Sequence, residues 1–478
     1  MLRFVCVECS HAMESDELAP ACEKCSAAVL LSWQEGVSVS RKQVDELPAG
    51  VWRYRAFFPG VDYEHTVTLG EGGTPLLRAE RLGIELGLRR LLIKDETRNP
   101  TGSFMDRGST VLLTAAKGRG VKECTCVTTG NLGASLSAYC AKAGIDARVK
   151  VHPNTDQGKL YQMLAYGAEI ETQQTRPRTR SSLEVTAGNP FLLEGEKTTG
   201  FEVAHDLDWA PPDAIVVPVG TGGHLSMIWH AITQLREAGF IDRTECRLIG
   251  VQVEGQSSPA RWARSAAPPT WQGTPLAELE ESEPYFRKEA ASAMRDSGGF
   301  VLTTTSPETI RATGLLARTE GIFAEPASSS VVAALAEAAR GGQIRAGETV
   351  VCVITGAGLK DTRAISRLAR ETRRPGGTAW YSPPGTQIGA TKAAILRLLS
   401  AKPNYGYELW LRLGAERKIS TASVYQHLNE LDSYGMVRRR GSVTSGGRER
   451  VLYELTKKGA DFLSIAGRLE RAGRSTRS

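Results

Sequence analysis

The sequence lacks any apolar run approaching the ~18 consecutive residues that a membrane-spanning helix requires, so no protein of that kind is expected. Its first residues, MLRFVCVECS, lack a basic start, an apolar core and a small-residue cleavage site. Because these are the parts of an export signal, we expect a cytoplasmic protein. That compartment keeps thiols reduced, which argues against a disulfide framework for the 9 cysteines.

Most of the chain also lacks an excess of either charge. Residues 1–384 hold 42 Lys and Arg against 45 Asp and Glu, whereas residues 385–478 hold 17 against 8. The surplus of positive charge therefore lies in the last fifth, which indicates a polyanionic partner for that segment alone. An ordinary composition, 41% apolar and 23% charged over 478 residues, predicts a globular chain of about two to four domains.

Four segments of the chain differ in character. Residues 1–35 carry paired cysteines, residues 36–370 alternate β-branched runs with helical patterns, residues 371–388 are rich in Pro, Gly and Ser, and residues 389–478 are mainly helical. Runs such as AIVVPVG, RLIGVQVEG and TVVCVITG, several of them followed by helical spacing, are typical of βαβ units. We therefore predict an α/β domain of doubly wound parallel sheets, flanked by a small N-terminal segment and by a linker to a C-terminal domain.

Four cysteines near the N-terminus are paired as Cys-x-x-Cys. Cys6 and Cys9 form one pair and Cys22 and Cys25 the other, and each pair can offer two thiolates to tetrahedral Zn²⁺. Four thiolates leave no open position for a substrate, so we predict a structural zinc ribbon over residues 1–35. The alternative is four coincidental free cysteines. The other five cysteines are expected to be buried apolar fillers: Cys124, Cys126, Cys140, Cys246 and Cys352.

Four further segments carry glycines and small polar residues where a strand meets a turn. Gly220–Leu225 follows the strand-like AIVVP and opens a helix, so its backbone N–H groups and the helix N-terminus can cradle a phosphate. A glycine-rich turn alone is a weak signal, because glycines also serve tight turns. Beside it stand Thr128–Ser135, Thr355–Asp361 and Asn99–Gly108. Together the four indicate a site for a phosphorylated aromatic cofactor.

Over nearly all of residues 1–370 the sequence resembles threonine synthase, a pyridoxal-phosphate enzyme of fold type II. The resemblance includes these segments, VWRYR at 51–55, EGGTPL at 71–76, EPAS at 325–328 and a zinc-ribbon-like start found in some members. It implies a tryptophan-synthase-beta-like fold in two subdomains with pyridoxal phosphate as the cofactor. By the family pattern, Asn131 would hydrogen-bond the ring hydroxyl and Thr355 would face the pyridine nitrogen. The phosphate would lie at Gly220, Thr221, Gly222, Gly223 and His224, and Phe104 would also contact the cofactor.

The lysine on which the family's chemistry depends is missing. Where the family usually reads Ser-Phe-Lys-Asp-Arg-Gly, residues 103–108 read SFMDRG, so the Schiff-base lysine position is Met105. A thioether cannot form an imine, which leaves no covalent tether and no proton shuttle. We therefore expect no catalytic residue, and pyridoxal phosphate bound non-covalently if it binds. Two alternatives stay open: an engineered replacement of lysine by methionine, and a substitute amine such as Lys94.

A second departure lies in the segment that in threonine synthases holds the phosphate of O-phosphohomoserine. That segment commonly resembles Asn-Ser-x-Asn-Pro-x-Arg-x-Glu-Gly, whereas residues 186–195 read TAGNPFLLEG. Leu192 stands where an arginine would hold the phosphate through charge-assisted hydrogen bonds, and Ala187 stands in place of the serine. The resemblance therefore implies that the substrate phosphate site departs from the family pattern as well.

Residues 389–478 indicate a winged helix-turn-helix that resembles the PadR-type regulators in YGYEL and SVYQHL. The pattern predicts helices over Thr391–Ala401, from Tyr405 to near Gly414 and over Thr421–Tyr434, the last capped by Ser420, and strands Val437–Arg440 and Val451–Leu455 joined by a basic hairpin over Ser442–Arg450. The third helix would enter the major groove of duplex DNA, and the hairpin would reach phosphates or the minor groove. The candidate DNA-contacting residues are Thr421, Ser423, Gln426, Arg448 and Arg450.

Two hypotheses about function follow. The first is a ligand-sensing transcriptional regulator, a homodimer whose retired threonine-synthase-like domain binds a small amino-acid-like or pyridoxal-type ligand and biases DNA binding. The second is a pyridoxal-phosphate-dependent threonine synthase or related lyase with an accessory DNA-binding domain. A winged helix used for protein contacts is the alternative for the C-terminal segment. Met105 favours the first hypothesis, since a sensor needs a site, an output domain and no turnover.

Overall fold

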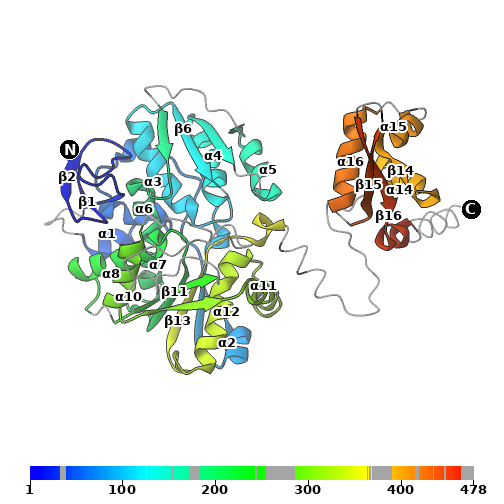
Figure 1. Ribbon diagram of the computed structural model, residues 1–478. Helices are drawn as coiled ribbons and strands as arrows, with labels where there is room; N and C mark the ends of the chain where they lie inside the picture. The colour runs from blue at the N-terminus through cyan, green and yellow to red at the C-terminus, as the bar shows by residue number, and fades with distance from the viewer. Residues whose placement is uncertain are drawn as a thin grey trace, which may run out of the picture. The chain divides into compact units, whose positions relative to one another are not determined.

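The chain forms two compact units, Met1–Thr372 and Arg373–Ser478, which are described separately. The computed structural model (Figure 1) describes residues 1–32, 39–128, 130–151, 155–171, 182–242, 245–253, 286–362, 364, 368, 390–414, 419–433, 435–445 and 448–463. Within those ranges no helix is both long enough and apolar enough to cross a membrane. The linker predicted over residues 371–388 lies outside the described residues.

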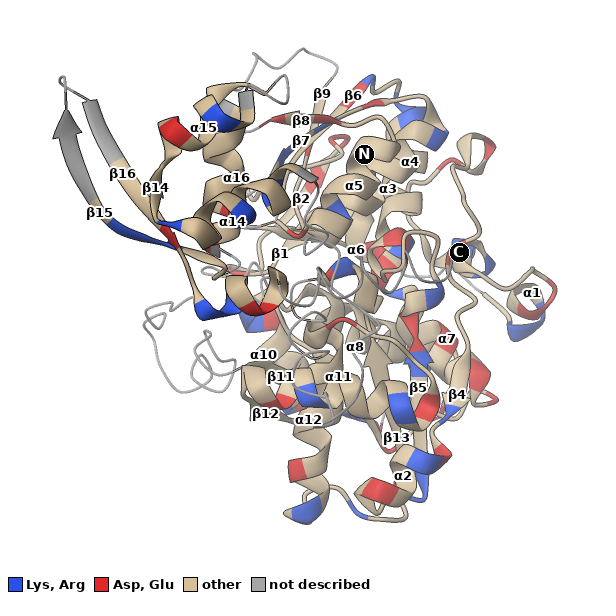
Figure 2. Ribbon diagram, turned by 90° about the vertical axis from the view of Figure 1, so that its right-hand side faces the viewer, with Lys and Arg blue, Asp and Glu red and all other residues tan. Residues whose placement is uncertain are grey.

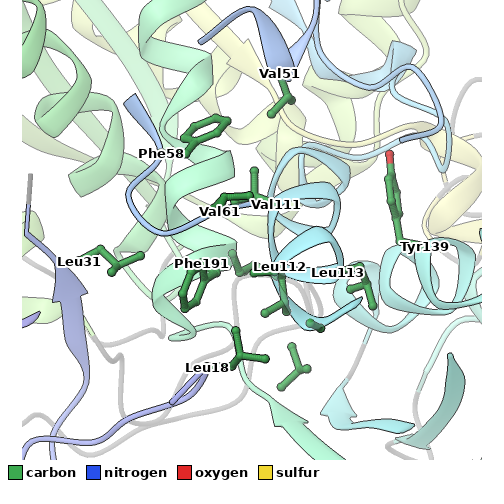
Figure 3. Packing of buried hydrophobic residues seen from close by; sticks show 14 of the residues in the cluster. Leu18, Leu31, Val51, Phe58, Val61, Val111, Leu112, Leu113, Tyr139 and Phe191 are labelled. Atoms are coloured by element: carbon green, nitrogen blue, oxygen red, sulfur yellow. The ribbon is translucent and has the colours of Figure 1, made fainter. Parts of the chain in front are cut away.

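The first unit begins with a small antiparallel sheet in the order β2-β1-β3. Its strands are β1 (Leu2–Cys6), β2 (Ala12–Ser15) and β3 (Val29–Leu31). Leu18 and Leu31 of this segment lie beside Phe191 and Leu112 of the main domain, as Figure 3 shows, and all four belong to one buried apolar cluster. The N-terminal segment therefore shares a core with the rest of the unit.

A six-stranded sheet forms the larger layer of the first unit, in the order β12-β11-β10-β13-β5-β4. Its strands are β12 (Phe300–Thr304), β11 (Arg247–Val253), β10 (Ala214–Pro218), β13 (Thr349–Ile354), β5 (Arg90–Asp95) and β4 (Leu76–Arg78). All pairings are parallel except that of β4 with β5. The runs AIVVP, RLIGVQV and TVVCVI are therefore strands of one sheet, as predicted.

Helices cover both faces of this sheet, which explains why its central strands are apolar throughout. Val216 packs toward α2 (Glu80–Leu86), α11 (Ser306–Glu320) and α12 (Pro326–Arg340). Its neighbours Ile215 and Val217 pack toward α7 (Thr198–Asp206), α8 (Gly223–Glu237) and α10 (Arg287–Asp296). The predicted doubly wound α/β architecture is confirmed for this part of the chain.

A second, four-stranded sheet has the order β8-β7-β6-β9 and is parallel throughout. It consists of β8 (Glu169–Glu171), β7 (Asp146–Val151), β6 (Glu123–Thr128) and β9 (Ser182–Val185), with α3 (Met105–Gly118), α4 (Asn131–Ala143), α5 (Gln157–Ala165) and α6 (Pro190–Glu196) nearby. Short helices complete the unit: α1 (Arg41–Asp45), η1 (Val51–Phe57), η2 (Tyr63–His65), η3 (Glu96–Arg98) and η5 (Gly358–Lys360). The five cysteines predicted as fillers are all buried.

The described part of the second unit contains the three predicted helices and the hairpin in the predicted order, and a further helical stretch at residues 457–463. The elements are α14 (Ala390–Ala401), β14 (Asn404–Tyr405), α15 (Gly406–Gly414), α16 (Thr421–Ser433), β15 (Val437–Ser445) and β16 (Arg448–Leu455). The predicted cap is present, because Ser420 Oγ accepts a hydrogen bond from Ser423 N at 3.2 Å. The predicted strand ends were wrong: Ser442–Ser445 and Arg448–Arg450 pair in the ladder and are not turn.

Candidate functional site

Loops from both sheets of the first unit meet at one place, which we call the loop junction: Phe104, Asn131, His224, Glu325 and Thr355. Phe104 N donates to Thr355 O at 3.0 Å, and Glu325 N donates to Gly356 O at 3.0 Å. Asn131 Nδ2 donates to Glu325 Oε1 at 2.9 Å. The residues predicted to contact the cofactor from the segments at 99–108, 128–135 and 355–361 are thus brought together.

His224 joins the loop junction through its ring. It stacks on Phe104 with centroids 4.2 Å apart and planes 15° from parallel, and its Nε2 lies 3.1 Å from Thr199 Oγ1. Burial lowers the pKa of His224 to about 3, so the imidazole is neutral. Nδ1 is buried and has no hydrogen-bond partner among the described residues. A buried nitrogen of this kind is expected to bond a ligand or an ordered water.

The glycine turn, Gly220–Gly223, precedes α8 directly. Gly222 has φ +89°, which favours glycine, and it is the N-cap of this 15-residue helix. A Cβ at Gly222 would lie 2.8 Å from the carbonyl oxygen of Phe286, so any larger residue is excluded on steric grounds as well. The N-cap glycine has no side chain to cap the helix. Gly223 N donates to Thr221 Oγ1 at 3.3 Å, so it is the N–H groups after Gly223 that are offered to an anion.

Further orphaned polar atoms mark the loop junction. In the part of the chain that the structure describes, Asn131 Oδ1 and Glu325 Oε2 are buried without a hydrogen-bond partner, as is His224 Nδ1. Thr355 Oγ1 and Ser328 Oγ are 2.7 Å apart. With the glycine turn beside them, these groups fit a phosphorylated aromatic ligand that offers several polar atoms.

Met105 is the first residue of α3 and immediately follows Phe104. It is half-buried and packs against the large apolar cluster of the first unit. The residues after it are structural: Asp106 accepts hydrogen bonds from Thr101 Oγ1 at 2.7 Å and from Ser135 Oγ at 2.6 Å. The motif SFMDRG therefore keeps its fold at the place where the amine is replaced.

Lys94 is a poor substitute for the missing amine. Its fully buried Nζ lies 2.8 Å from Thr74 O, 2.8 Å from Asp206 Oδ2 and 2.9 Å from Glu202 Oε2. An ammonium group held by two carboxylates has no lone pair for attack on a carbonyl. The structure therefore assigns Lys94 a scaffold role.

Two other lysines near the loop junction were missed by the sequence analysis. Lys159 Nζ is fully buried, 3.6 Å from Glu325 Oε2 and close to Gly130. Lys360 Nζ donates to Thr101 O at 2.8 Å and to Gln162 Oε1 at 3.0 Å, and burial lowers its pKa to about 8. Lysine usually lies on solvated surfaces, so only the tertiary structure shows these two as interior residues.

Leu192 lies in the apolar core and faces α3. It is fully buried, and its Cγ lies 2.6 Å from where a Cβ on Gly108 would stand. Phe191 and Leu193 beside it are also fully buried. Residues 191–193, within the segment that the resemblance relates to the substrate phosphate, are thus part of the apolar core.

The four N-terminal cysteines converge as the spacing predicts. Sγ of Cys6 and Cys25 are 3.5 Å apart, Sγ of Cys9 and Cys22 are 3.6 Å apart, and the four sulfurs lie within 4.8 Å of one another. Tetrahedral Zn²⁺ with bonds of about 2.3 Å separates its sulfurs by about 3.8 Å. The donor set therefore fits a four-thiolate metal site.

The candidate DNA-contacting residues lie on α16 and β16. Gln426 is exposed and donates to Glu430 Oε1 at 3.2 Å, whereas Thr421 and Ser423 are half-buried at the start of α16. Arg448 and Arg450 belong to β16, but their side chains lie outside the described residues. The basic run at 438–440 was not among the predicted DNA-contacting residues, and it is exposed on β15 and appears blue in Figure 2.

Family models match both units. The model for pyridoxal-phosphate dependent enzymes matches residues 67–356, and that for the transcriptional regulator PadR-like family matches residues 395–465. Threonine synthase of Methanocaldococcus jannaschii is 35% identical over 384 residues, covering 77% of this chain and 95% of the relative. Threonine synthase of Mycobacterium leprae is 37% identical over 328 residues, covering 66% and 89%.

Solved structures show the same fold. Threonine deaminase isoform 2 from Solanum lycopersicum aligns with a TM-score of 0.53 at 15% identity, covering 74% of this chain and all of that one. An L-serine ammonia-lyase from Rhizomucor miehei aligns with a TM-score of 0.53 at 20% identity, covering 63% and 98%. At these identities the likeness concerns the fold alone.

Proposed function

This chain belongs to the pyridoxal-phosphate-dependent enzyme family, and from that premise we propose that it is a ligand-sensing transcriptional regulator. Its threonine-synthase-like domain has lost its chemistry and is joined to a PadR-like unit that binds DNA. The observation that carries the proposal is Met105, which occupies the start of α3 where the family has its reactive lysine. The apolar Leu192 supports it, because the side chain offers nothing to a substrate phosphate.

The loop junction is the proposed ligand site. The glycine turn and the N-terminus of α8 would hold a phosphate, Asn131 the ring hydroxyl, and Thr355 the pyridine nitrogen. Phe104 and His224 would line one side of the ring through their stack. Pyridoxal phosphate, when bound, supplies an electron sink for amino-acid chemistry. Without an amine at residue 105, the protein would hold this cofactor, or a related amino-acid-like ligand, non-covalently.

Zinc is the metal we propose for the four N-terminal cysteines, which would make residues 1–35 a zinc ribbon. The short three-stranded sheet shares its apolar core with the main domain, and a metal would further stabilise it by joining its two Cys-x-x-Cys turns. The role is structural, since four thiolates fill the coordination sphere.

The second unit would act as a winged helix that binds duplex DNA as a homodimer. α16 would enter the major groove with Gln426 exposed toward the bases, and the hairpin β15–β16, which carries Arg448 and Arg450, would contact phosphates. Regulators of this type act on two half-sites related by a two-fold axis. Action on DNA agrees with the cytoplasmic location that the sequence predicts.

DNA binding is tested by fluorescence anisotropy of the full-length protein on its own upstream region at several salt concentrations. We expect binding that falls steeply with salt. Replacing Arg448 and Arg450 by alanine should reduce the salt slope by about 1 for each DNA phosphate that is no longer neutralised. The change Gln426→Ala should alter base preference instead. An absence of binding at low salt would reject the regulator.

An active lyase is the second candidate, and one observation favours it. Lys159 and Lys360 lie in the interior beside the loop junction, and the pKa of Lys360, lowered by burial to about 8, leaves part of it unprotonated near neutrality. Borohydride reduction of wild-type protein with pyridoxal phosphate, followed by peptide mapping, distinguishes the two candidates. A stable adduct on either lysine supports the lyase, and its absence supports the regulator.

A further inference from the structure

Val7 and Glu8, which lie between Cys6 and Cys9, contact residues 286–288 beside the glycine turn. Glu8 lies between Cys6 and Cys9, and its Oε2 is 2.6 Å from Lys288 Nζ, which also donates to Glu8 O at 2.9 Å. Val7 is buried in one apolar cluster with Phe286. The turn between Cys6 and Cys9, which we call the cysteine knuckle, therefore packs directly against residues 286–288.

Phe286 in turn forms a wall of the glycine turn. Its backbone N donates to Thr221 O at 3.1 Å. A Cβ on Gly222 would lie 2.8 Å from Phe286 O, and one on Gly223 would lie 3.3 Å from the Phe286 ring. The glycine turn thus has no spare room on the side of Phe286. A displacement of Phe286 would therefore move the N–H groups of the turn.

The N-terminal segment also packs against Leu193 of α6, which contacts the glycine turn on another side. Leu193 Cδ2 lies 2.8 Å from where a Cβ on Gly223 would stand, and Leu193 shares its apolar cluster with Val7 and Leu30. Asn189, which caps α6, donates from Nδ2 to Leu18 O at 2.9 Å. Figure 3 shows Leu18 and Leu31 against Phe191 of the same helix.

From these contacts we propose that the four-cysteine metal site and the glycine turn are thermodynamically coupled, so that metal occupancy sets the affinity of the turn for a phosphate-bearing ligand. The cysteine knuckle orders Val7 and Glu8, these residues hold Phe286 and Lys288, and Phe286 with Leu193 fixes the turn. This makes Val7, Glu8 and Phe286 positioning residues for the ligand phosphate. The inference rests on the proposed function in one respect, that the turn holds a phosphate.

Coupling of this kind is reciprocal. If metal binding tightens the ligand by some factor, then the ligand tightens the metal by the same factor. Couplings between sites in one protein typically lie at about 5- to 150-fold, and we expect a value within that range. Removal of the metal by a chelator would then weaken ligand binding without any contact between the chelator and the ligand.

The test measures hydrogen exchange and ligand affinity on the full-length protein. Exchange at the amides of residues 221–226 is compared between the zinc-loaded and the chelated protein, with β13 as an internal reference. We expect faster exchange at the turn after zinc removal and unchanged exchange at β13. Dissociation constants for pyridoxal phosphate with and without zinc, and for zinc with and without pyridoxal phosphate, should change by the same factor.

A double variant addresses the case in which the chelated protein unfolds. Val7→Ala with Glu8→Gln keeps all four cysteines, so zinc stays bound, yet the turn should exchange faster and bind pyridoxal phosphate more weakly than wild type. The matched control is Val5→Ala with Glu14→Gln, which makes the same changes on β1 and β2 at residues outside the apolar cluster of Val7 and Phe286. It should leave the turn unchanged.

Each outcome decides one question. The coupling is overturned if exchange at the turn is unchanged in chelated protein whose N-terminal amides have lost protection. It is also overturned if exchange at the turn is unchanged in the double variant. Equal effects of the double variant and its control overturn it too. If pyridoxal phosphate binds neither form while the turn still responds to zinc, the proposed cofactor is wrong, and the structural link between the metal site and the turn is supported.

Discussion

Two sets of buried polar groups in the first unit differ in how fully their hydrogen-bonding capacity is used. In the first set, the Arg107 cluster, the guanidinium makes six hydrogen bonds at 2.6–3.0 Å to Glu96, Glu202, Thr74 and Thr198. In the second set, the loop junction, three buried atoms have no such partner in the described chain. The SFMDRG motif contributes to both sets, since Phe104 belongs to the loop junction and Arg107 follows it by three positions.

This difference separates scaffold from ligand site. Burial by itself raises the pKa of Glu202, but the Arg107 guanidinium and Lys94 outweigh it and hold that pKa below its usual range. Such a closed network needs no ligand. The loop junction needs one to complete its hydrogen bonds. The Arg107 cluster therefore stabilises the fold without a ligand, whereas we propose that the chemistry of the neighbouring site has changed.

Restoring the amine should give the largest effect, a covalent site without efficient turnover. Met105→Lys is expected to form a borohydride-stable adduct with pyridoxal phosphate at residue 105, whereas Met105→Leu forms none. Ala187 and Leu192 remain apolar at the two positions where the family pattern has phosphate-binding residues. Each charge-assisted hydrogen bond that is absent costs about 1.5–3 kcal/mol. Turnover of O-phosphohomoserine should therefore stay about 100-fold or more below that of threonine synthase relatives. Family-like turnover from this single change would contradict our interpretation of residues 186–192.

Breaking the Arg107 cluster should give the next largest effect. Arg107→Met leaves Glu96 and Glu202 buried without their main cation, and we expect a loss of about 3–5 kcal/mol in the free energy of unfolding. Urea unfolding of the full chain, followed by circular dichroism, measures it. Arg78→Met is the matched control, because Arg78 is exposed and its ion pair within the described residues is with exposed Glu80 at 3.6 Å. The control should change stability by less than about 0.5 kcal/mol.

Glu196 sharpens the comparison through pH. Unlike Glu202, it has burial as its single cause of shift, which raises its pKa to about 8. The folded state therefore keeps a proton on Glu196 that the unfolded state releases above pH ~4.5. The contribution of Glu196 to the free energy of unfolding is complete below that pH and is lost as pH rises through about 8. We expect Glu196→Gln to remove a slope of about 1 kcal/mol per pH unit between those limits, measured by urea unfolding. The exposed Glu237→Gln should leave the slope unchanged.

The sequence predicted the parts of the fold that depend on local pattern. Uninterrupted apolar runs such as Ala214–Pro218 specify strands buried on both faces, and Gly222 specifies a turn that only glycine can make. The cysteine spacing likewise brought four sulfurs together. Met105 was recognisable because the rest of its motif is intact.

The remaining features depend on contacts between distant segments. Lys159 and Lys360 look like surface lysines in sequence, and they become interior residues only when α5 and η5 pack against the loop at residue 101. The hairpin is longer than predicted, because cross-strand pairing carries Ser442–Ser445 into the ladder despite their weak strand preference. The contact of Glu8 with Lys288 spans 280 positions and leaves no local signal.

The smallest effect we expect separates the two nitrogens of His224. His224→Phe keeps an aromatic ring against Phe104 but removes both nitrogens, whereas Thr199→Val removes only the partner of Nε2 at 3.1 Å. If Nδ1 contacts the ligand, His224→Phe should weaken the binding of pyridoxal phosphate about 10-fold, because one hydrogen bond to a charged group is lost. Thr199→Val should weaken this binding by less than about 3-fold. Isothermal titration calorimetry measures both. Equal losses would place the role of His224 in the scaffold with Arg107, because the second nitrogen would then contribute nothing to ligand binding.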